Sequence, residues 1–260
     1  MLYAELTSPE IARLAPDSVA VLPLAAVEQH GDHLPVITDT TIVTEIASRA
    51  EKAMQAKVLL LPTLWPGCSH HHLGFPGTLS ISSETYVRVL CDLMQSLLAA
   101  GCRRIFLLNG HGGNQTPFTE ALFRIALKHK EPWVSAQSYW KLAASEIAEQ
   151  GFMKTAALSH ACEYETSMML ALRPDLVKMD LAKGACPGHG SDFYDPLDYQ
   201  PSRVVVRETF DSLSPTGALG SPELASAEKG RKLFDTITPV VVAFLQEFAK
   251  WPLPMENRSK

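Results

Sequence analysis

Residues 104–114, RIFLLNGHGGN, decide the fold class of this chain. The apolar run at 104–108 has the length of a buried β-strand, and a loop of asparagine, glycine and histidine follows it directly. Before it, residues 84–100 carry apolar side chains at helical spacing and stop at Gly101, which predicts a helix with glycine at its C-terminal end. After it, residues 115–129 predict a second helix. A strand between two helices is typical of a parallel α/β sheet.

The same alternation of short apolar runs and longer helical patterns covers the rest of the chain. It predicts strands at 18–25, 58–61, 133–138 and 203–208, and helices at 40–55, 140–149, 162–172 and from Pro222 to Lys250. Pro239 lies inside the last helix, where its missing backbone N–H should force a kink or a break. The order of these elements predicts a mainly parallel sheet with helices on both faces.

The length and composition are those of one large globular domain. The chain has 260 residues, of which 46% are hydrophobic and 20% charged, and these values exclude a disordered, collagen-like or coiled-coil protein. Residues 184–202, rich in Gly, Pro, Asp and Tyr, form the longest expected loop. No apolar core surrounds this loop, so we interpret it as an insertion that shapes the mouth of a site, with His189 in it. We therefore assign residues 1–260 to a single domain.

The charge and the cysteines limit the expected partners and location. With 23 Lys and Arg against 28 Asp and Glu, the net charge is −5 and no basic run is present, which disfavours nucleic acid and anionic membrane as partners. No apolar stretch reaches the roughly 18 residues of a membrane span, and the first residues do not resemble a secretory signal. Five scattered cysteines without a CxxC pair favour reduced thiols. We expect a cytoplasmic protein.

Histidines and carboxylates gather where the expected strands end. All of the nine histidines except His129 lie in loops or at loop edges. The groups along the chain are Glu28, His30, His33 and Asp39; His70, His71 and His72; His111; and His160, Glu163 and Glu165. Because ligands of parallel sheets bind beyond the carboxyl ends of the strands, this clustering predicts a metal site.

The residue types limit the metal and the number of ions. Carboxylates and imidazoles without an obvious thiolate favour Zn²⁺, Mn²⁺ or Fe²⁺. Two imidazoles and three carboxylates exceed what one catalytic zinc ion uses, so two ions that share a bridging carboxylate fit better. Asp39 also begins an expected helix, and its alternative role is the N-cap of that helix.

Other motifs are incomplete or missing from the sequence. The stretch GHGG at 110–113 follows a strand and suggests dinucleotide binding, but Gln115 replaces the third glycine of GxGxxG. The chain has neither a Walker A motif nor a GxSxG elbow. Cys162 lies between His160 and Glu163 without any motif of a nucleophile, and we expect it to be a small packing residue.

Two other classes of function remain open at this point. A binuclear metal phosphoesterase uses the same types of ligand, although no Arg or Lys accompanies the motif loops to clamp a phosphate. A non-catalytic metal-binding protein would have closed and saturated metal coordination.

Six blocks of the sequence resemble the creatininase family, which comprises creatinine amidohydrolases and related enzymes. Residues 27–35, VEQHGDHLP, with Asp39 following, are similar to that family's EQHGPHLP…D signature. The other blocks follow in the family's order: GFPGT at 74–78, NGHGGN at 109–114, SYW at 138–140, HACEYETS at 160–167, and GALGSP at 217–222 with EKG at 228–230. The resemblance covers almost the whole chain and implies a three-layer α/β/α sandwich, two divalent metal ions per chain and a homohexamer.

The resemblance also implies the metal ligands. One ion takes Glu28, Asp39 and His111, and the other takes His30, the same Asp39 as a bridge, and a further glutamate.

The further glutamate is where the chain departs from the creatinine hydrolases, whose Tyr-Glu pair after the histidine is Gly112-Gly113 here. Relatives with the HGGN sequence carry a glutamate three residues after the later histidine, which implies Glu163 as ligand and catalytic residue. Glu165 is the second choice. At the start of a helix the two side chains point about 200° apart, so only one of them should reach the metals. The other should hold a histidine ligand or anchor packing.

The resemblance implies a metal-dependent amidohydrolase that hydrolyses a non-peptide C–N bond of a small cyclic-amide or N-formyl substrate. His160 is expected to deliver a proton to the leaving nitrogen or, alternatively, to hold a structural hydrogen bond. His72, Trp140 and Gly112 are the candidate substrate contacts. His33 is expected to orient a metal ligand.

Overall fold

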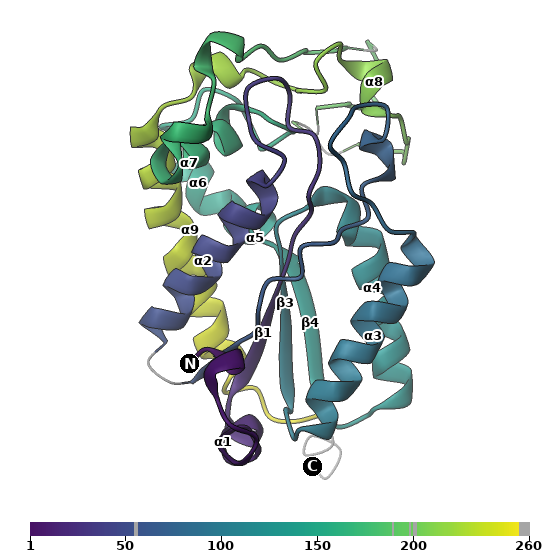
Figure 1. Ribbon diagram of the computed structural model, residues 1–260, viewed down its shortest axis with the longest axis vertical. Helices are drawn as coiled ribbons and strands as arrows, with labels where there is room; N and C mark the ends of the chain where they lie inside the picture. The colour runs from purple at the N-terminus through teal and green to yellow at the C-terminus, as the bar shows by residue number, and fades with distance from the viewer. Residues whose placement is uncertain (55–56, 189, 198, 200–201, 255–260) are drawn as a thin grey trace.

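The computed structural model of the protein describes residues 1–54, 57–188, 190–197, 199 and 202–254, and a parallel sheet lies at its centre (Figure 1). The strands are β1 (Val19–Leu24), β2 (Val58–Leu60), β3 (Arg104–Asn109) and β4 (Trp133–Ser138), in the spatial order β2-β1-β3-β4. Leu24 pairs with Asn109, and Asn109 pairs with Ser138. These three strands therefore end at one edge, and the loops that follow them leave the sheet side by side.

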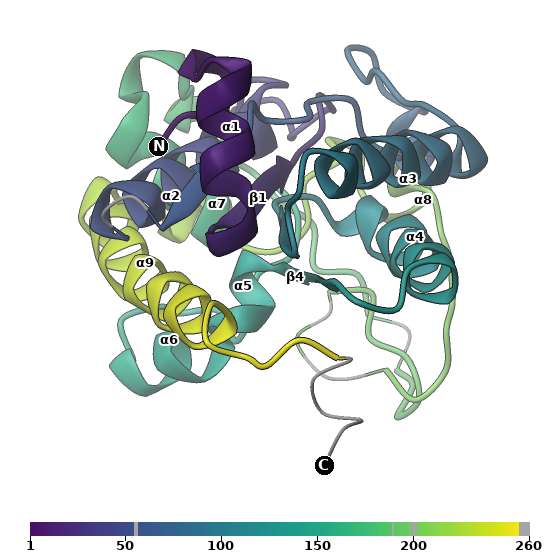
Figure 2. The same ribbon diagram turned by 90° about the horizontal axis from the view of Figure 1, so that it is seen from below.

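Helices cover both faces of this sheet (Figure 2). One layer contains α2 (Thr38–Ala53), α5 (Tyr139–Leu142), α6 (Ala144–Gln150), α7 (Glu163–Leu172) and α9 (Ala227–Phe248), and the other contains α3 (Ser83–Ala99) and α4 (Gln115–Lys128). Successive residues of β1 point to opposite layers: Val19 and Val21 pack in the first, Ala20 and Leu22 in the second. The expected α/β fold, a parallel sheet between two helical layers, is confirmed.

The other described elements are short. The helices are α1 (Ser8–Leu14) and α8 (Phe210–Leu213), and the 3-10 helices are η1 (Tyr3–Glu5), η2 (Ala15–Asp17), η3 (His70–His72), η4 (Gly112–Asn114), η5 (Pro174–Leu176), η6 (Met179–Leu181) and η7 (Pro222–Leu224). In Figure 1, α8 lies at the end of the molecule toward which the strands point. Between η6 and α8 the described residues form neither helix nor strand, which confirms a long loop here. His189 lies outside the described residues.

The expected helices are found, with two changes. The helix expected at 140–149 is divided into α5 and α6 by Ala143, whose backbone angles are not helical. The helix expected from Pro222 begins at Ala227 instead, because the Ser226 side chain accepts a hydrogen bond from the Lys229 backbone N–H and caps it there.

The sequence predicts a kink or a break at Pro239; the break is wrong, since α9 continues through this residue, and the kink stays a prediction. A proline removes one backbone donor, which leaves the carbonyl of Asp235 without its helical partner. Both residues are exposed, so water can satisfy that carbonyl.

The predicted strand at 203–208 is also wrong, because the described residues 202–209 contain no strand. Val204 and Val205 are 47% and 83% exposed. The preference of valine for strands depends on burial against neighbouring strands, and this segment has none.

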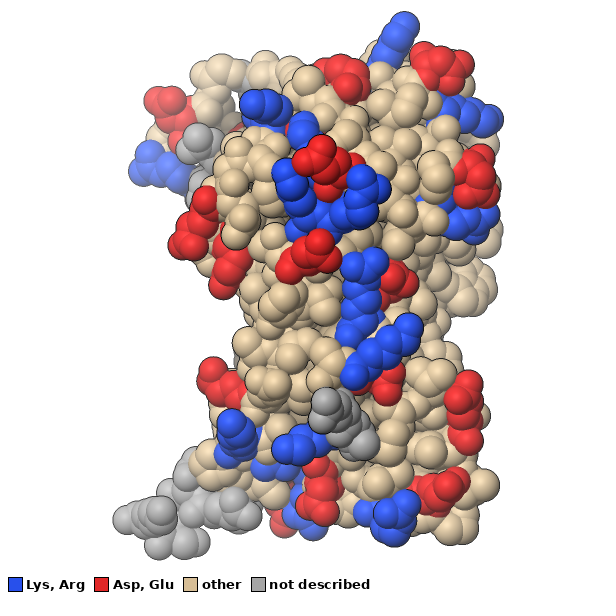
Figure 3. Space-filling view, turned by 90° about the vertical axis from the view of Figure 1, so that its left-hand side faces the viewer, with Lys and Arg blue, Asp and Glu red and all other residues tan. Residues whose placement is uncertain are grey.

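The surface carries charges of both signs. Figure 3 shows Lys and Arg side chains interspersed with Asp and Glu on one face of the molecule. On this face the cations do not gather into a patch of the kind that binds nucleic acid. None of the described helices has the length and the apolar character that a membrane span requires.

Candidate metal centre

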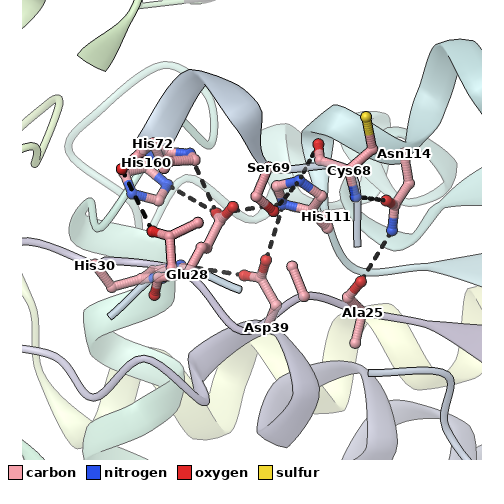
Figure 4. Close-up of polar contacts among 12 residues, drawn as sticks. Ala25, Glu28, His30, Asp39, Cys68, Ser69, His72, His111, Asn114 and His160 are labelled. Carbon is pink, nitrogen blue, oxygen red and sulfur yellow. Dashed lines mark hydrogen bonds and ion pairs between the residues drawn. The ribbon is translucent and has the colours of Figure 1, made fainter. Parts of the chain in front are cut away.

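Loops at the carboxyl edge of the sheet bring carboxylates and imidazoles together, and most of them are drawn in Figure 4. Their members are Glu28, His30, Asp39, His72, His111, His160 and Glu165, which we call the centre. None of these residues is more than 8% exposed. The sequence motifs thus converge in space as expected, although they come from loops after β1 and β3, from η3, and from the starts of α2 and α7.

Glycines allow the loops to come this close. Gly31 turns the chain after His30 with a φ of +64°, a backbone conformation that residues other than glycine rarely adopt. A Cβ atom at Gly113 would lie 2.0 Å from the Cys68 carbonyl oxygen, so the loop of His111 touches the neighbouring loop only because residue 113 has no side chain. At Gly112, by contrast, a Cβ atom would meet nothing within 4 Å.

Asp39 lies between two histidines. Its Oδ1 is 3.1 Å from Nε2 of His30, and its Oδ2 is 3.0 Å from Nδ1 of His111. The N-cap of α2 is Ile37, and Asp39 lies in the first turn of the helix, so the alternative role of Asp39 as N-cap is excluded. Each carboxylate oxygen therefore faces a different imidazole.

Glu28 faces the histidines on the other side. Its Oε1 lies 3.2 Å from Nδ1 of His111, 3.3 Å from Nε2 of His72 and 3.6 Å from Nδ1 of His160. Burial raises the pKa of this carboxyl, and the nearby Asp39 charge raises it further. A positive charge placed in the centre would therefore stabilise the ionised form of Glu28.

Glu165, the second choice of the sequence analysis, lies in the centre, whereas Glu163, the first choice, does not. Oε1 of Glu165 is 3.7 Å from Nε2 of His30. The Glu163 carboxylate points away and accepts hydrogen bonds from the backbone N–H groups of Lys154 and Thr155, and it forms an ion pair with Lys229. The oxygens of Glu163 are therefore occupied elsewhere.

The charges of the centre fit divalent cations. Oε2 of Glu28 and Oε2 of Glu165 are buried and have no hydrogen-bond partner among the described residues, although buried polar atoms normally have one. Burial opposes a charge on His30, yet the Asp39 and Glu165 carboxylates raise its pKa well above the ordinary value. Carboxylates and imidazoles that together favour a positive charge are the donor set of Zn²⁺ and Mn²⁺.

Gln29 holds two neutral imidazoles beside Glu28. Burial lowers the pKa of His72 and of His160 well below the ordinary value. The side-chain oxygen of Gln29 accepts from the Gly31 backbone N–H over 2.9 Å, and its NH₂ group donates to Nδ1 of His72 over 2.7 Å. We assign Nε2 of His160 as the donor to the backbone carbonyl oxygen of Gln29, 2.9 Å away. The lone pair of His160 is then on Nδ1, which faces the centre.

Replacing Gln29 with leucine should destabilise the protein. The Gly31 N–H and Nδ1 of His72 would both lose a buried partner, and each such loss costs about 1–3 kcal/mol. Urea denaturation measures the change, with the exposed Gln150→Leu as the matched control. Equal denaturation midpoints for the two variants would mean that these hydrogen bonds do not form.

His33 and Trp140, two further predicted site residues, are not members of the centre. Nε2 of His33 lies 2.9 Å from Oγ1 of Thr166, and burial together with the nearby His30 lowers the pKa of His33 to about 4. Trp140 packs edge-on against Tyr139 in α5, with the ring centroids 5.0 Å apart. The assigned roles of His33 and Trp140 stay predictions.

Sequence reasoning missed the residues that tie the loops together. Asn114 accepts a hydrogen bond from the Cys68 backbone N–H and donates to the Ala25 carbonyl, each over 3.0 Å. Oγ of Ser69 lies 3.1 Å from Nε2 of His111. Asn114 is part of the NGHGGN motif, but nothing in a single sequence indicates which loops its side chain joins.

Known proteins resemble this chain over most of its length. Residues 4–245 match the creatininase family model, described as creatinine amidohydrolase. Creatinine amidohydrolase of Pseudomonas putida is 30% identical over 267 residues, which cover 95% of this chain and 97% of that protein. A 3-dehydro-scyllo-inosose hydrolase of Thermotoga maritima is 28% identical, covering 93% and 82%, and a mycofactocin precursor peptide peptidase of Mycobacterium ulcerans is 30% identical, covering 89% and 84%.

Solved structures are similar as well. A creatininase described as the Mn form superposes with a TM-score of 0.77 at 27% identity, covering 96% of this chain and 99% of that one. A mutant creatininase of the Zn–Zn type superposes with a TM-score of 0.75 at 26% identity, covering 96% and 98%.

Proposed function

The chain belongs to the creatininase family and is a hydrolase of that family, and from this premise we propose that it cleaves the C–N bond of a small non-peptide amide, either cyclic or N-formylated. We also propose that the centre holds two divalent ions, Zn²⁺, Mn²⁺ or Fe²⁺. The similarity to structures of Mn and Zn–Zn creatininases supports the first two metals. The observation that carries the proposal is the position of Asp39 between two imidazoles, each facing a different carboxylate oxygen.

The proposed ligand sets follow from the distances. One ion would be held by Glu28, Asp39 and His111, and the other by His30, Asp39 and Glu165. Glu165 takes the place for which the sequence favoured Glu163. Its unpartnered, buried Oε2 supports this assignment.

The bound ions and the protein's own side chains would make different contributions to the reaction. Two bound divalent ions would lower the pKa of a water molecule at the centre and polarise the carbonyl group of an amide. The chain's own contribution is to hold the ligands in place and to exclude bulk water, since each ligand side chain is buried.

His160 is the residue that we propose to move the proton. It is neutral, its Nε2 is fixed by the Gln29 carbonyl, and its Nδ1 lone pair faces Glu28. Nδ1 takes a proton from the water whose oxygen attacks the amide carbon. The same proton then passes to the nitrogen as the C–N bond breaks, which leaves a carboxylic acid and an amine.

Replacing His160 with glutamine should lower kcat by about 10²–10⁴-fold, the usual contribution of a positioned acid–base group. The metal content should not change, because His160 is not among the proposed ligands. Amine release from the preferred amide and elemental analysis of the same samples check both statements. An unchanged kcat would mean that His160 does not transfer the proton and has only the structural role of its hydrogen bond to Gln29.

An amide panel tests the function itself. Protein reloaded with Zn²⁺ or Mn²⁺ after chelation is given creatinine, N-formyl amines, small lactams, a short peptide and an aryl phosphate. Hydrolysis of a non-peptide amide that stops on chelation supports the proposal. Cleavage of only the peptide or only the phosphate contradicts it, and the second result would favour a phosphoesterase.

A further inference from the structure

One aromatic ring lies directly on the histidines of the centre. Phe210 begins the short helix α8, and its ring centroid is 4.0 Å from that of His72, 4.7 Å from that of His160 and 5.5 Å from that of His71. At such separations the rings are in van der Waals contact. No substrate group fits between Phe210 and the imidazoles of His72 and His160.

The catalytic groups are covered in this conformation. Glu28 is 1% exposed and His160 is 8% exposed. An amide that is attacked beside Glu28 and receives a proton from His160 has to reach both side chains. Phe210 contacts the imidazole that donates this proton, so its ring has to move before the substrate can bind.

The surroundings of Phe210 permit such a movement. The ring has no polar atom to anchor it, and the described residues 202–209 before it form neither helix nor strand. On its other side α8 rests on the loop after η3, where a Cβ atom at Gly74 would lie 2.5 Å from Cγ of Asp211. The position of α8 therefore depends on the missing side chain of residue 74.

We propose that Phe210 is a gate over the centre and determines substrate size: it leaves the imidazoles to admit a small amide, and its ring limits the groups that fit above them. This inference rests on the proposed function, because it assumes an amide bound at Glu28 and His160. It adds a residue that no sequence motif indicates and that is not a metal ligand.

Chemical modification tests the gate without measuring activity. Diethyl pyrocarbonate acylates accessible neutral imidazoles, and peptide mass spectrometry gives the rate for each histidine. In Phe210→Ala, His72 and His160 should be acylated about tenfold faster than in the protein without a substitution, because the covering ring is gone. Gly74→Ala should act in the same direction by displacing Asp211. The exposed His70 should react equally in all variants.

The matched control is Phe123→Ala, which makes the same change at a residue that is 64% exposed on α4. It should leave the rates at His72 and His160 unchanged. The gate is overturned if His72 and His160 are acylated at the same rates in Phe210→Ala, in Gly74→Ala and in the protein without a substitution. Circular dichroism confirms that each variant is folded, and Gly74→Ala keeps the test valid if Phe210→Ala does not fold.

Substrate selectivity provides the second measurement. With metal loaded, Phe210→Ala should raise kcat/KM for N-formyl benzylamine relative to N-formyl methylamine by about tenfold. Changed modification rates in a protein that hydrolyses no amide would refute the proposed function but keep the gate. Amide hydrolysis with unchanged rates and unchanged selectivity would refute the gate alone.

Discussion

Asp39→Asn should remove both metal ions from the protein. One oxygen of Asp39 faces His30 and the other faces His111, so this side chain is the only proposed ligand shared by the two sites. Asparagine replaces one of these acceptors by an NH₂ donor, which cannot bind a cation, and it removes the negative charge that both sites share. We expect the metal content to fall from about two ions per chain to fewer than one.

The activity should fall with the metal. Loss of a residue that merely supports a ligand costs about 10–100-fold, so loss of a shared ligand should lower kcat/KM by about 10³-fold or more. Elemental analysis and amide hydrolysis on the same samples measure the two effects. Asp32→Asn is the matched control, because Asp32 lies in the loop that leads to α2 but is exposed. If Asp39→Asn keeps its full metal content, Asp39 does not bridge two ions.

Glu165→Gln and Glu163→Gln should have different effects, although the two residues are nearly adjacent. Glu165→Gln should lose the ion next to His30 and keep the one held by Glu28 and His111, because Glu165, and not Glu163, lies near His30. Glu163→Gln should keep both ions, since the Glu163 carboxylate is bound to Lys229 and to backbone N–H groups instead. Elemental analysis of both variants checks the assignment. Metal loss in Glu163→Gln but not in Glu165→Gln would restore the ligand that the sequence favours.

Glu163→Gln should instead lower the stability of the fold. The substitution removes an ion pair and weakens charge-assisted hydrogen bonds from the segment that leads to His160, a loss of about 1–3 kcal/mol. Urea denaturation of the two variants and the unmodified protein measures this loss.

The stability effect of Glu163 should depend on pH in a defined direction. Burial opposes ionisation of Glu163, but Lys229 and the N–H groups of Thr155 and Lys154 hold its pKa below the ordinary value of 4.5. A carboxyl whose pKa is lower in the folded state stabilises the fold above its unfolded pKa, and this stabilisation is lost as the pH falls through the folded pKa. The difference between the unmodified protein and Glu163→Gln should therefore be full at pH 7 and shrink below pH 4.5. A difference that grows on acidification would contradict the ion pair.

The sheet was predictable because most of its strand residues lie in short runs that a loop or a helix signal follows, and such patterns are local. The runs that form β1, β2 and β3 are mainly apolar and buried, whereas β4 (WVSAQS) is half polar and only partly buried. Residues 203–208 have the same composition as a strand but no neighbour to pair with. Whether a valine-rich segment becomes a strand depends on distant residues, so the sequence pattern could not decide it.

The centre was predictable in its members but not in its geometry. Three of the six motif blocks contribute members of the centre, and the blocks that follow β1 and β3 meet because these strands are parallel and end at one edge. The role of Gln29 and the position of Phe210 were not predictable, since each depends on contacts between segments far apart in the chain.

The choice between Glu163 and Glu165 separates what the sequence determined from what the tertiary structure decided. Helical spacing determined that the two side chains point in different directions, so that only one could reach the metals. It could not determine which one, because spacing fixes the angle between two residues but not the rotation of the helix about its own axis. That rotation is set where α7 packs on α9: a Cβ atom at Gly230 would lie 1.9 Å from the Ser167 carbonyl oxygen, so the two helices meet closely at this point. This contact directs Glu165 to the centre and Glu163 to Lys229.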